Sequence, residues 1–198
     1  DVSAAALAAF DLERGHARTH EIGPLLTGLR ERLVPLLKKI AAAPRQPPKG
    51  LFAKGHRFPE EAQKAFGLTV MRDMGFDLEA GRLDTANHPF CSSAAPTDVR
   101  LTTRYDEADP RSCFFSIVHE TGHGLYEQGF DLVHLGTPMA EAASLGIHES
   151  QSRLWENQIA RSRPFWEHYY PILRSHFPEA LSAVSLDDFY FSVNEVHP

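Results

Sequence analysis

The sequence contains few cysteines and no long hydrophobic run. Cys91 and Cys113 are the only cysteines among 198 residues, which excludes a disulfide framework, and their spacing fits no zinc finger. No window approaches the roughly 18 consecutive apolar residues of a membrane-spanning helix, so the sequence predicts no membrane partner. The first residues lack a basic segment followed by an apolar one, so we expect no signal peptide and a cytoplasmic protein with reduced thiols.

Basic charge is scarce where a nucleic-acid surface would need it. Lys and Arg number 20 against 26 Asp and Glu, for a net charge of −6. Residues 1–99 carry 13 basic and 12 acidic side chains, whereas residues 100–198 carry 7 and 14. A phosphate backbone requires a clustered basic surface. We therefore expect no nucleic-acid partner.

Hydrophobic spacing predicts a mainly α protein with a small β element. Helices are expected over residues 3–42, 59–74, 111–128 and 138–163 and in two short pieces of 164–191, a strand over 98–105, and irregular structure over 41–50 and 76–97. Pro24 and Pro35 are expected to begin or kink a helix rather than lie in its interior. The pattern predicts one helical fragment, with N-terminal helices in residues 1–50 and a second region in residues 51–198.

Histidine is unusually frequent, and seven of the eleven histidines follow residue 100. The predicted helix 111–128 contains the pentapeptide H-E-T-G-H, in which His119 and His123 lie one turn apart on one face. Both imidazoles can therefore bind one metal ion, with Glu120 beside it. The alternative is a pair of ordinary helical histidines. The apolar residues that precede the motif favour a metal, because buried histidines and glutamates are costly unless they are paired or metal-bound.

Glycines within this helix also need an explanation. Gly122 and Gly124 each cost about 1 kcal/mol relative to alanine in a helix interior. They are understandable if another element packs very close to that face. The sequence therefore predicts that something packs very close to this face of the helix, beside the histidines.

A catalytic zinc takes three protein ligands and one water. A third histidine six residues after His123 is excluded, because position 129 is glycine. A glutamate from a following segment is the alternative, and the candidates are Glu127, Glu141, Glu149 and Glu156. Glu149 is favoured because a loop and a returning helix fit between it and His123, and because His148, Ser150 and Arg153 flank it as partners that could orient a carboxylate. Glu141 is the main rival.

Four short motifs occur in a distinctive order. They are H-P-F at 88–90, D-V-R-L-T at 98–102, H-E-T-G-H at 119–123 and H-E-S-Q at 148–151. Together they resemble the thermostable metallocarboxypeptidase family whose name-giving member is carboxypeptidase Taq. The resemblance implies that His119, His123 and Glu149 bind the metal and that Glu120 is the general base. It also implies a largely helical homodimer, with two metal-bearing helices, that removes single C-terminal residues from peptides using zinc or cobalt.

Other residues of these motifs are candidates for contacts with the substrate or with the metal ligands. His88 precedes a proline, which favours an extended backbone, and the motif gives it an active-site role. Arg100 either pairs with Asp98 or Asp84 or faces the cleft as a partner of the substrate carboxylate. Asp98 could orient a ligand imidazole.

Three functions are compatible with these patterns. Members of the resembled family are much longer, and their later motifs, I/N-R-x-x-A/S-D and G-x-x-Q-D-x-H-W, do not occur here. We therefore expect a chain truncated at its C-terminus that can hold metal and be a poor enzyme. The leading hypothesis is a zinc-dependent metallocarboxypeptidase. The alternatives are another HExxH endopeptidase or oligopeptidase, which would also cleave peptides with a blocked C-terminus, and an inactive metal-binding helical module.

Overall fold

The chain divides into two compact units, residues 1–46 and 47–198. A computed structural model describes residues 18–44, 51–52 and 55–195. The boundary between the units falls within residues 41–50, where the sequence predicts irregular structure.

The first unit contains helix α2 (Thr19–Ala41). Pro24 and Pro35 both lie inside it, so the prediction that they would avoid a helix interior is wrong. The helix begins instead at Arg18, whose backbone N–H donates to the Glu21 carboxylate at 2.9 Å. Its apolar face is exposed, with Leu25 at 72%. The part of the predicted helix over residues 3–17 lies outside the described residues.

A mixed three-stranded sheet lies in the second unit. Strands β1 (Gly81–Thr85), β2 (Phe90–Ala95) and β3 (Asp98–Thr103) are arranged in the order β1-β3-β2. β1 runs parallel to β3, and β2 runs antiparallel to it. The predicted strand is β3, which ends at Thr103. The prediction of irregular structure over 76–97 is wrong for β1 and β2, because both are edge strands without a buried side chain and so lack the apolar alternation of a half-buried strand.

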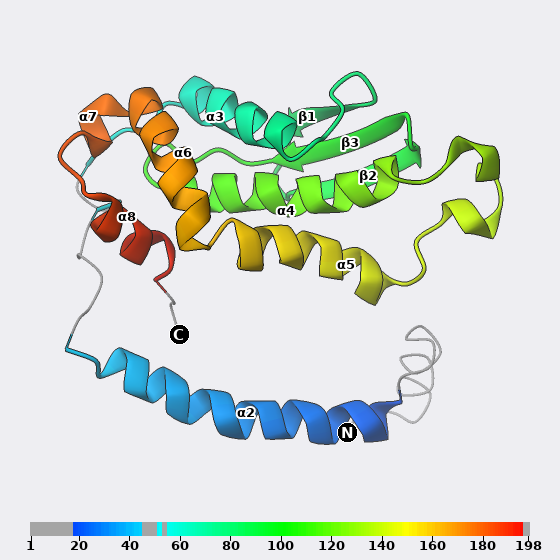
Figure 1. Cartoon of the computed structure of the whole chain (residues 1–198), viewed down its shortest axis with the longest axis horizontal. Coiled ribbons are helices and arrows are strands. Elements are labelled where there is room, and N and C mark those ends of the chain that lie inside the picture. Colours follow the sequence, from blue (N-terminus) through cyan, green and yellow to red (C-terminus); the bar gives the residue numbers. More distant parts are fainter. Residues whose placement is uncertain (1–17, 45–50, 53–54, 196–198) are drawn as a thin grey trace. The chain divides into compact units, whose positions relative to one another are not determined.

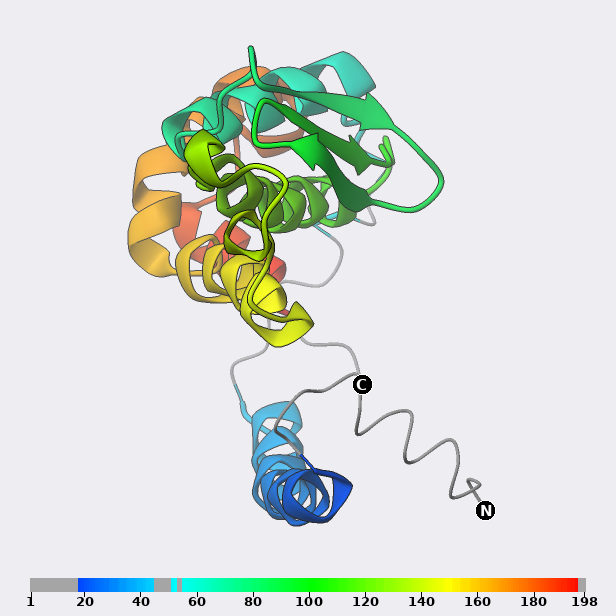
Figure 2. The same ribbon diagram turned by 90° about the vertical axis from the view of Figure 1, so that its right-hand side faces the viewer.

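Helix α4 (Pro110–Gln128) is the central element of the second unit. The Asp109 carboxylate accepts from the backbone N–H of Arg111 at its start, and Gly129 follows its last residue, which confirms the predicted helix to within one residue. The sheet and α3 (Glu60–Asp73) pack on one side of α4, and α5 (Leu145–Arg153) packs on the other (Figures 1 and 2). No described helix is long and apolar enough to cross a membrane.

The helix predicted over 138–163 begins later than expected. Two single 3₁₀ turns come first, η1 (Leu132–His134) and η2 (Pro138–Ala140). The backbone is extended at Glu141 and at Ser144. The Ser144 hydroxyl then accepts from the backbone N–H of Ile147 and caps α5. After Arg153 the chain continues as a π-helical segment, η3 (Leu154–Ile159).

Three helices follow, where the sequence predicted two short pieces. They are α6 (Arg163–His176), α7 (Pro178–Leu181) and α8 (Leu186–Val193). Proline at the first position of α7 ends the preceding helix, as proline commonly does. The aromatic side chains of this region form the main hydrophobic core together with side chains of α3 and α4. The core includes Phe66, Phe114, Trp166, Tyr170 and Phe189. The N-terminal half of α4 is thereby anchored.

Gly122 allows the backbones of α4 and α5 to touch. A Cβ atom at this position would lie 2.7 Å from Ser152 Cα and 2.8 Å from the Gln151 carbonyl oxygen. Gly124 makes room for the Phe76 ring, which would lie 2.6 Å from its Cβ. The predicted close contact beside the histidines is confirmed, and its partner at Gly122 is the helix that carries Glu149.

The substitution Gly122→Ala is expected to destabilise the metal-free protein by about 1–3 kcal/mol. Alanine would gain about 1 kcal/mol of helix propensity, but its Cβ would meet backbone atoms of α5 that cannot rotate away. Urea unfolding measures the difference. The matched control is Gly146→Ala in α5, where a Cβ would lie 3.8 Å from the nearest atom. A G122A protein as stable as G146A would contradict the close packing.

Candidate metal centre

His119, His123 and Glu149 converge between α4 and α5. One possible ligand atom from each lies within 4.8 Å of the other two, and no second such group of three occurs in the described part of the chain. Glu149 Oε2 lies 3.6 Å from His119 Nε2 and 3.2 Å from His123 Nε2. Two imidazole nitrogens and one carboxylate oxygen are a donor set that suits zinc with one position left for water. The residues present therefore fit a catalytic divalent metal.

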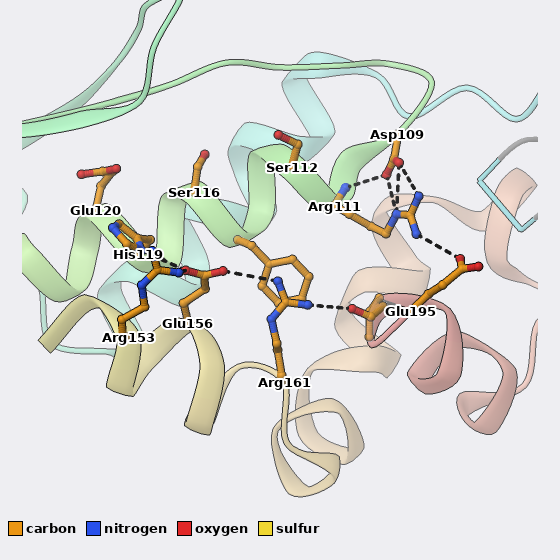
Figure 3. Close-up of a pocket in the computed structure, with 12 residues that line it drawn as sticks. Asp109, Arg111, Ser112, Ser116, His119, Glu120, Arg153, Glu156, Arg161 and Glu195 are labelled. Carbon is orange, nitrogen blue, oxygen red and sulfur yellow. Dashed lines mark hydrogen bonds and ion pairs between the residues drawn. The ribbon is translucent and has the colours of Figure 1, made fainter. Parts of the chain in front are cut away.

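The other ring nitrogen of each histidine faces a hydrogen-bonding partner. His119 Nδ1 lies 2.9 Å from Glu156 Oε2, and the two side chains point toward each other in Figure 3. His123 Nδ1 contacts Nδ1 of His148. His148 Nε2 in turn lies 2.7 Å from Glu127 Oε1. Both Nε2 atoms are therefore directed to the point that Glu149 also faces.

The two imidazoles differ in their affinity for protons. The hydrogen bond with Glu156 raises the pKa of His119 above its ordinary value. Burial, together with the neighbouring His148 and His119, lowers the pKa of His123 to about 4. His123 is therefore neutral at physiological pH, whereas His119 holds its proton to a higher pH than an ordinary histidine, and a metal ion has to compete with that proton.

Two neighbours orient the Glu149 carboxylate. Arg153 Nε donates to Glu149 Oε1 at 2.7 Å, and the Ser152 hydroxyl donates to Oε2 at 3.1 Å. Burial alone would raise the pKa of Glu149, but these hydrogen bonds outweigh it and hold the pKa below its ordinary value. Glu149 is therefore ionised at neutral pH, the state in which a carboxylate binds metal.

Glu120 lies beside the ligands and has a different environment. Only 6% of its surface is exposed. Burial raises its pKa to about 7, against the opposing effect of His119. A carboxyl group with a pKa near neutrality can both accept and release a proton, which is what a general base that later acts as an acid requires.

Two clefts meet at His119 and Glu120. One, of about 510 Å³, is bordered by the residues that precede and begin β2 and by α5; its lining includes His88, Phe90, Cys91, Leu145 and His148. The other, of about 470 Å³, follows α4 toward its N-terminus (Figure 3). In this second cleft Arg161 stacks on the Phe115 ring, at 3.8 Å from its centroid, and donates to Glu156 Oε1 at 3.3 Å.

The remaining sequence candidates are distributed unevenly. His88 is exposed and lines the larger cleft, and Arg153 contacts Glu149 and Glu156. Asp98 accepts two hydrogen bonds from Arg100, each of 2.8 Å, instead of orienting an imidazole. The reason is that residues i and i+2 of a strand point to the same face. Neither lines the two clefts at His119.

Glu156 contacts the His119 imidazole in the way that the sequence predicts for Asp98, and Glu127 contacts His148, which in turn contacts His123. The sequence offers Glu156 and Glu127 only as alternative third ligands. Glu127 lies one turn after His123, and Glu156 lies two turns after Glu149. The same helical spacing that predicts the metal site therefore places each glutamate on the helix face that carries His123 or Glu149. Glu141, the main rival of Glu149, is exposed and does not belong to the cluster.

Comparisons with known proteins extend over nearly the whole chain. The family model of the carboxypeptidase Taq (M32) metallopeptidase matches residues 8–198. The thermostable carboxypeptidase 1 of Thermus thermophilus is 47% identical over 182 residues, which are 91% of this chain and 35% of that protein. Carboxypeptidase 1 of Bacillus subtilis is 39% identical over 191 residues, 96% of this chain and 38% of that protein. The M32 carboxypeptidase of Deinococcus radiodurans has a crystal structure that matches with a TM-score of 0.90 and 42% identity, over 96% of this chain and 38% of that one. The chain thus spans little more than a third of the length of these relatives.

Zinc is expected to bind with a stoichiometry of one and to stabilise the fold. A ligand at a thousandfold excess over its Kd adds about 4 kcal/mol if it binds only the folded state. Glu149→Ala should weaken zinc binding by more than about 100-fold, because it removes a ligand rather than a supporting group. Calorimetric titration measures the stoichiometry and the affinity, and thermal unfolding with and without zinc measures the stabilisation. Glu141→Ala is the control, and an equal loss in this variant would contradict the ligand assignment.

Glu120→Gln is expected to change how the stability of the metal-free protein depends on pH. Between the ordinary pKa of 4.5 and about 7, the folded protein holds a proton on Glu120 that the unfolded chain has released. The free energy of unfolding of the native sequence therefore falls as pH rises through this window. The glutamine variant lacks this loss and should be more stable at neutral pH, by up to about 3 kcal/mol. Urea unfolding at several pH values tests this, with the exposed Glu79→Gln as control; parallel curves for all three proteins would refute it.

Proposed function

Because this chain belongs to the carboxypeptidase Taq (M32) metallopeptidase family, we propose that it is the metal-binding part of a carboxypeptidase that releases C-terminal residues from peptides. One observation carries the proposal. Two imidazole nitrogens and a carboxylate oxygen converge on one point, with a buried glutamate of raised pKa beside them. This is the arrangement that metal-assisted hydrolysis requires.

Zinc is the metal we propose, with cobalt as the alternative. Imidazole nitrogen and carboxylate oxygen suit zinc, and three protein ligands leave a position for water, as in other catalytic zinc sites. Cobalt accepts the same donors, and affinity alone does not separate the two metals in a cell. The divalent state itself follows from the family.

Different residues of this chain have different roles in the proposed hydrolysis. A bound divalent cation supplies the Lewis acidity that lowers the pKa of a water molecule and polarises the scissile carbonyl group. Glu120 accepts the proton from the attacking water and delivers it to the leaving amine. Its pKa near 7 permits both transfers. His119, His123 and Glu149 hold the cation, and Arg153 and Ser152 keep the Glu149 carboxylate aimed at it.

The larger cleft is the proposed site of the peptide beside the metal. It is open beside Glu120 and is lined by His88 and Phe90, which precede and begin β2. We propose that His88 contacts the bound peptide there. A free C-terminal carboxylate also needs a cationic partner. Arg153 contacts Glu149 directly, although its guanidinium is engaged by two glutamates.

The proposed setting of the enzyme is a homodimer in the cytoplasm. The dimer rests on the family resemblance of the sequence motifs. The cytoplasm is favoured by Cys91 and Cys113, which are free thiols that are half-buried and buried, respectively, as expected in a reducing compartment.

The zinc-loaded chain is expected to hydrolyse an N-blocked dipeptide with a free C-terminus slowly, as the poor enzyme that the sequence predicts, and to leave its C-terminal amide intact. Glu120→Gln should retain one zinc and lose at least about 100-fold in kcat/KM, because general-base catalysis is typically worth that much. Product release is followed by chromatography, and zinc content is measured in the same samples.

Each other outcome contradicts one part of the proposal. Equal cleavage of the amide would favour an endopeptidase. Unchanged hydrolysis in E120Q would exclude Glu120 as the base. Full zinc occupancy with no hydrolysis of either peptide would favour a metal-binding module without activity.

A further inference from the structure

Each of the two ligand imidazoles is supported at its Nδ1 atom, directly or indirectly, by a different carboxylate. His119 Nδ1 faces Glu156 directly, at 2.9 Å. His123 Nδ1 reaches Glu127 through His148, which contacts His123 with one ring nitrogen and Glu127 with the other. One imidazole thus has a direct support and the other an indirect one.

The position of each proton follows from what its partner can accept. An ionised carboxylate only accepts hydrogen bonds. Neutral His119 must therefore carry its proton on Nδ1, where it donates to Glu156, and its Nε2 keeps a free lone pair. The same reasoning places the proton of neutral His148 on Nε2, where it donates to Glu127. His148 Nδ1 is then an acceptor, so His123 must donate from Nδ1 and also keeps its lone pair on Nε2.

We propose that Glu156 and the His148–Glu127 pair are positioning residues that set both ligand histidines in the Nδ1–H tautomer before metal binds. The inference rests on the proposed function only in taking His119, His123 and Glu149 as the metal ligands. Neutral histidine in water favours the opposite tautomer, with the proton on Nε2. Without these partners, each imidazole would have to exchange its proton between nitrogens when the metal arrives.

Glu156 is built into the structure more firmly than a surface carboxylate. Its side chain is 14% exposed and receives hydrogen bonds from Arg161 and Arg153 as well as from His119. Arg161 is itself fixed on the Phe115 ring and by the Val193 carbonyl oxygen, which accepts at 2.9 Å. Glu156 belongs to the π-helical segment η3, a rare geometry that is frequent at functional sites.

The second support joins α4 and α5. Glu127 lies on α4, one turn after His123, and His148 lies on α5, next to Glu149. The side chains of Glu127 and His148 are 20% and 19% exposed, so water competes little for their hydrogen bond. The Tyr126 ring packs edge-on against the His148 ring, with the centroids 5.2 Å apart, and restricts its rotation. The contact that supports His123 therefore also positions the segment that supplies the third ligand.

Nitrogen NMR of the histidine rings tests the tautomers directly. In the metal-free 198-residue chain at alkaline pH, where the histidines are neutral, we expect the proton on Nδ1 of His119 and His123 and on Nε2 of His148. Glu156→Leu should move the His119 proton to Nε2, and Glu127→Leu should do the same for His123. The conservative variants E156Q and E127Q keep an acceptor oxygen and should retain the native tautomers.

Metal affinity is the second readout, measured by competition with a chromophoric chelator for zinc. Each leucine variant should bind zinc about 10–100-fold more weakly than the native chain, as is typical when an outer partner of a ligand histidine is lost. The glutamine variants should lose much less, and the exposed Glu79→Gln should lose nothing. A purely structural role would lower the melting temperature of the leucine variants without changing tautomer or affinity.

The outcomes separate this inference from the proposed function. A proton on Nε2 of His119 or His123 in the native chain overturns the inference, even if the leucine variants fail to fold. Equal zinc affinity in folded leucine and glutamine variants also overturns it. Native tautomers as expected, together with no peptide hydrolysis, would support the inference and count against the carboxypeptidase alone.

Discussion

The backbone contact between α4 and α5 is the constraint on which the rest of the site depends. Gly122 brings the two helices to within van der Waals contact of their main chains. The residue it meets, Ser152, is fully buried and also donates to the Glu149 carboxylate. One contact therefore sets both the distance between the helices and the orientation of the Glu149 carboxylate. A wider separation would leave the histidines of α4 without a carboxylate in reach.

Electrostatics then gives the glutamates of the site different properties. Glu120 has no arginine among the groups that shift its pKa, and burial raises that pKa to about 7. Glu149 and Glu156 receive hydrogen bonds from arginines, and their pKa values are held below the ordinary value despite burial. Divergent pKa values of neighbouring carboxyl groups indicate a division between proton transfer and charge stabilisation. The two carboxyl groups with lowered pKa values contact the two histidines of the candidate metal centre, and Glu120, whose pKa is raised, lines the clefts.

The remainder of the second unit keeps α4 in place. The aromatic core of α3, α6 and α8 packs against its N-terminal half, and the sheet packs against the helix through Val99 and Leu101. Histidines one turn apart stay aligned only on a helix that does not bend or slide. The rigid surroundings of α4 therefore contribute to the site by holding the two histidines in place.

The sequence by itself determined what depends on neighbours along the chain. Helix α4 was predictable from the Asp109–Pro110 start, the apolar spacing and Gly129, because helix caps and periodicity are local properties. The same local rule put His119 and His123 on one face with Glu120 beside them. The tertiary structure decided what depends on distant partners. Strands β1 and β2 exist because β3 pairs with both, Asp98 is held by its strand neighbour Arg100, and Glu156 and Glu127 become supports of imidazoles once α5 and η3 lie against α4. A glutamate's role as ligand, base or support is set by which groups surround it in space, and sequence spacing reports those groups only within a single helix or strand.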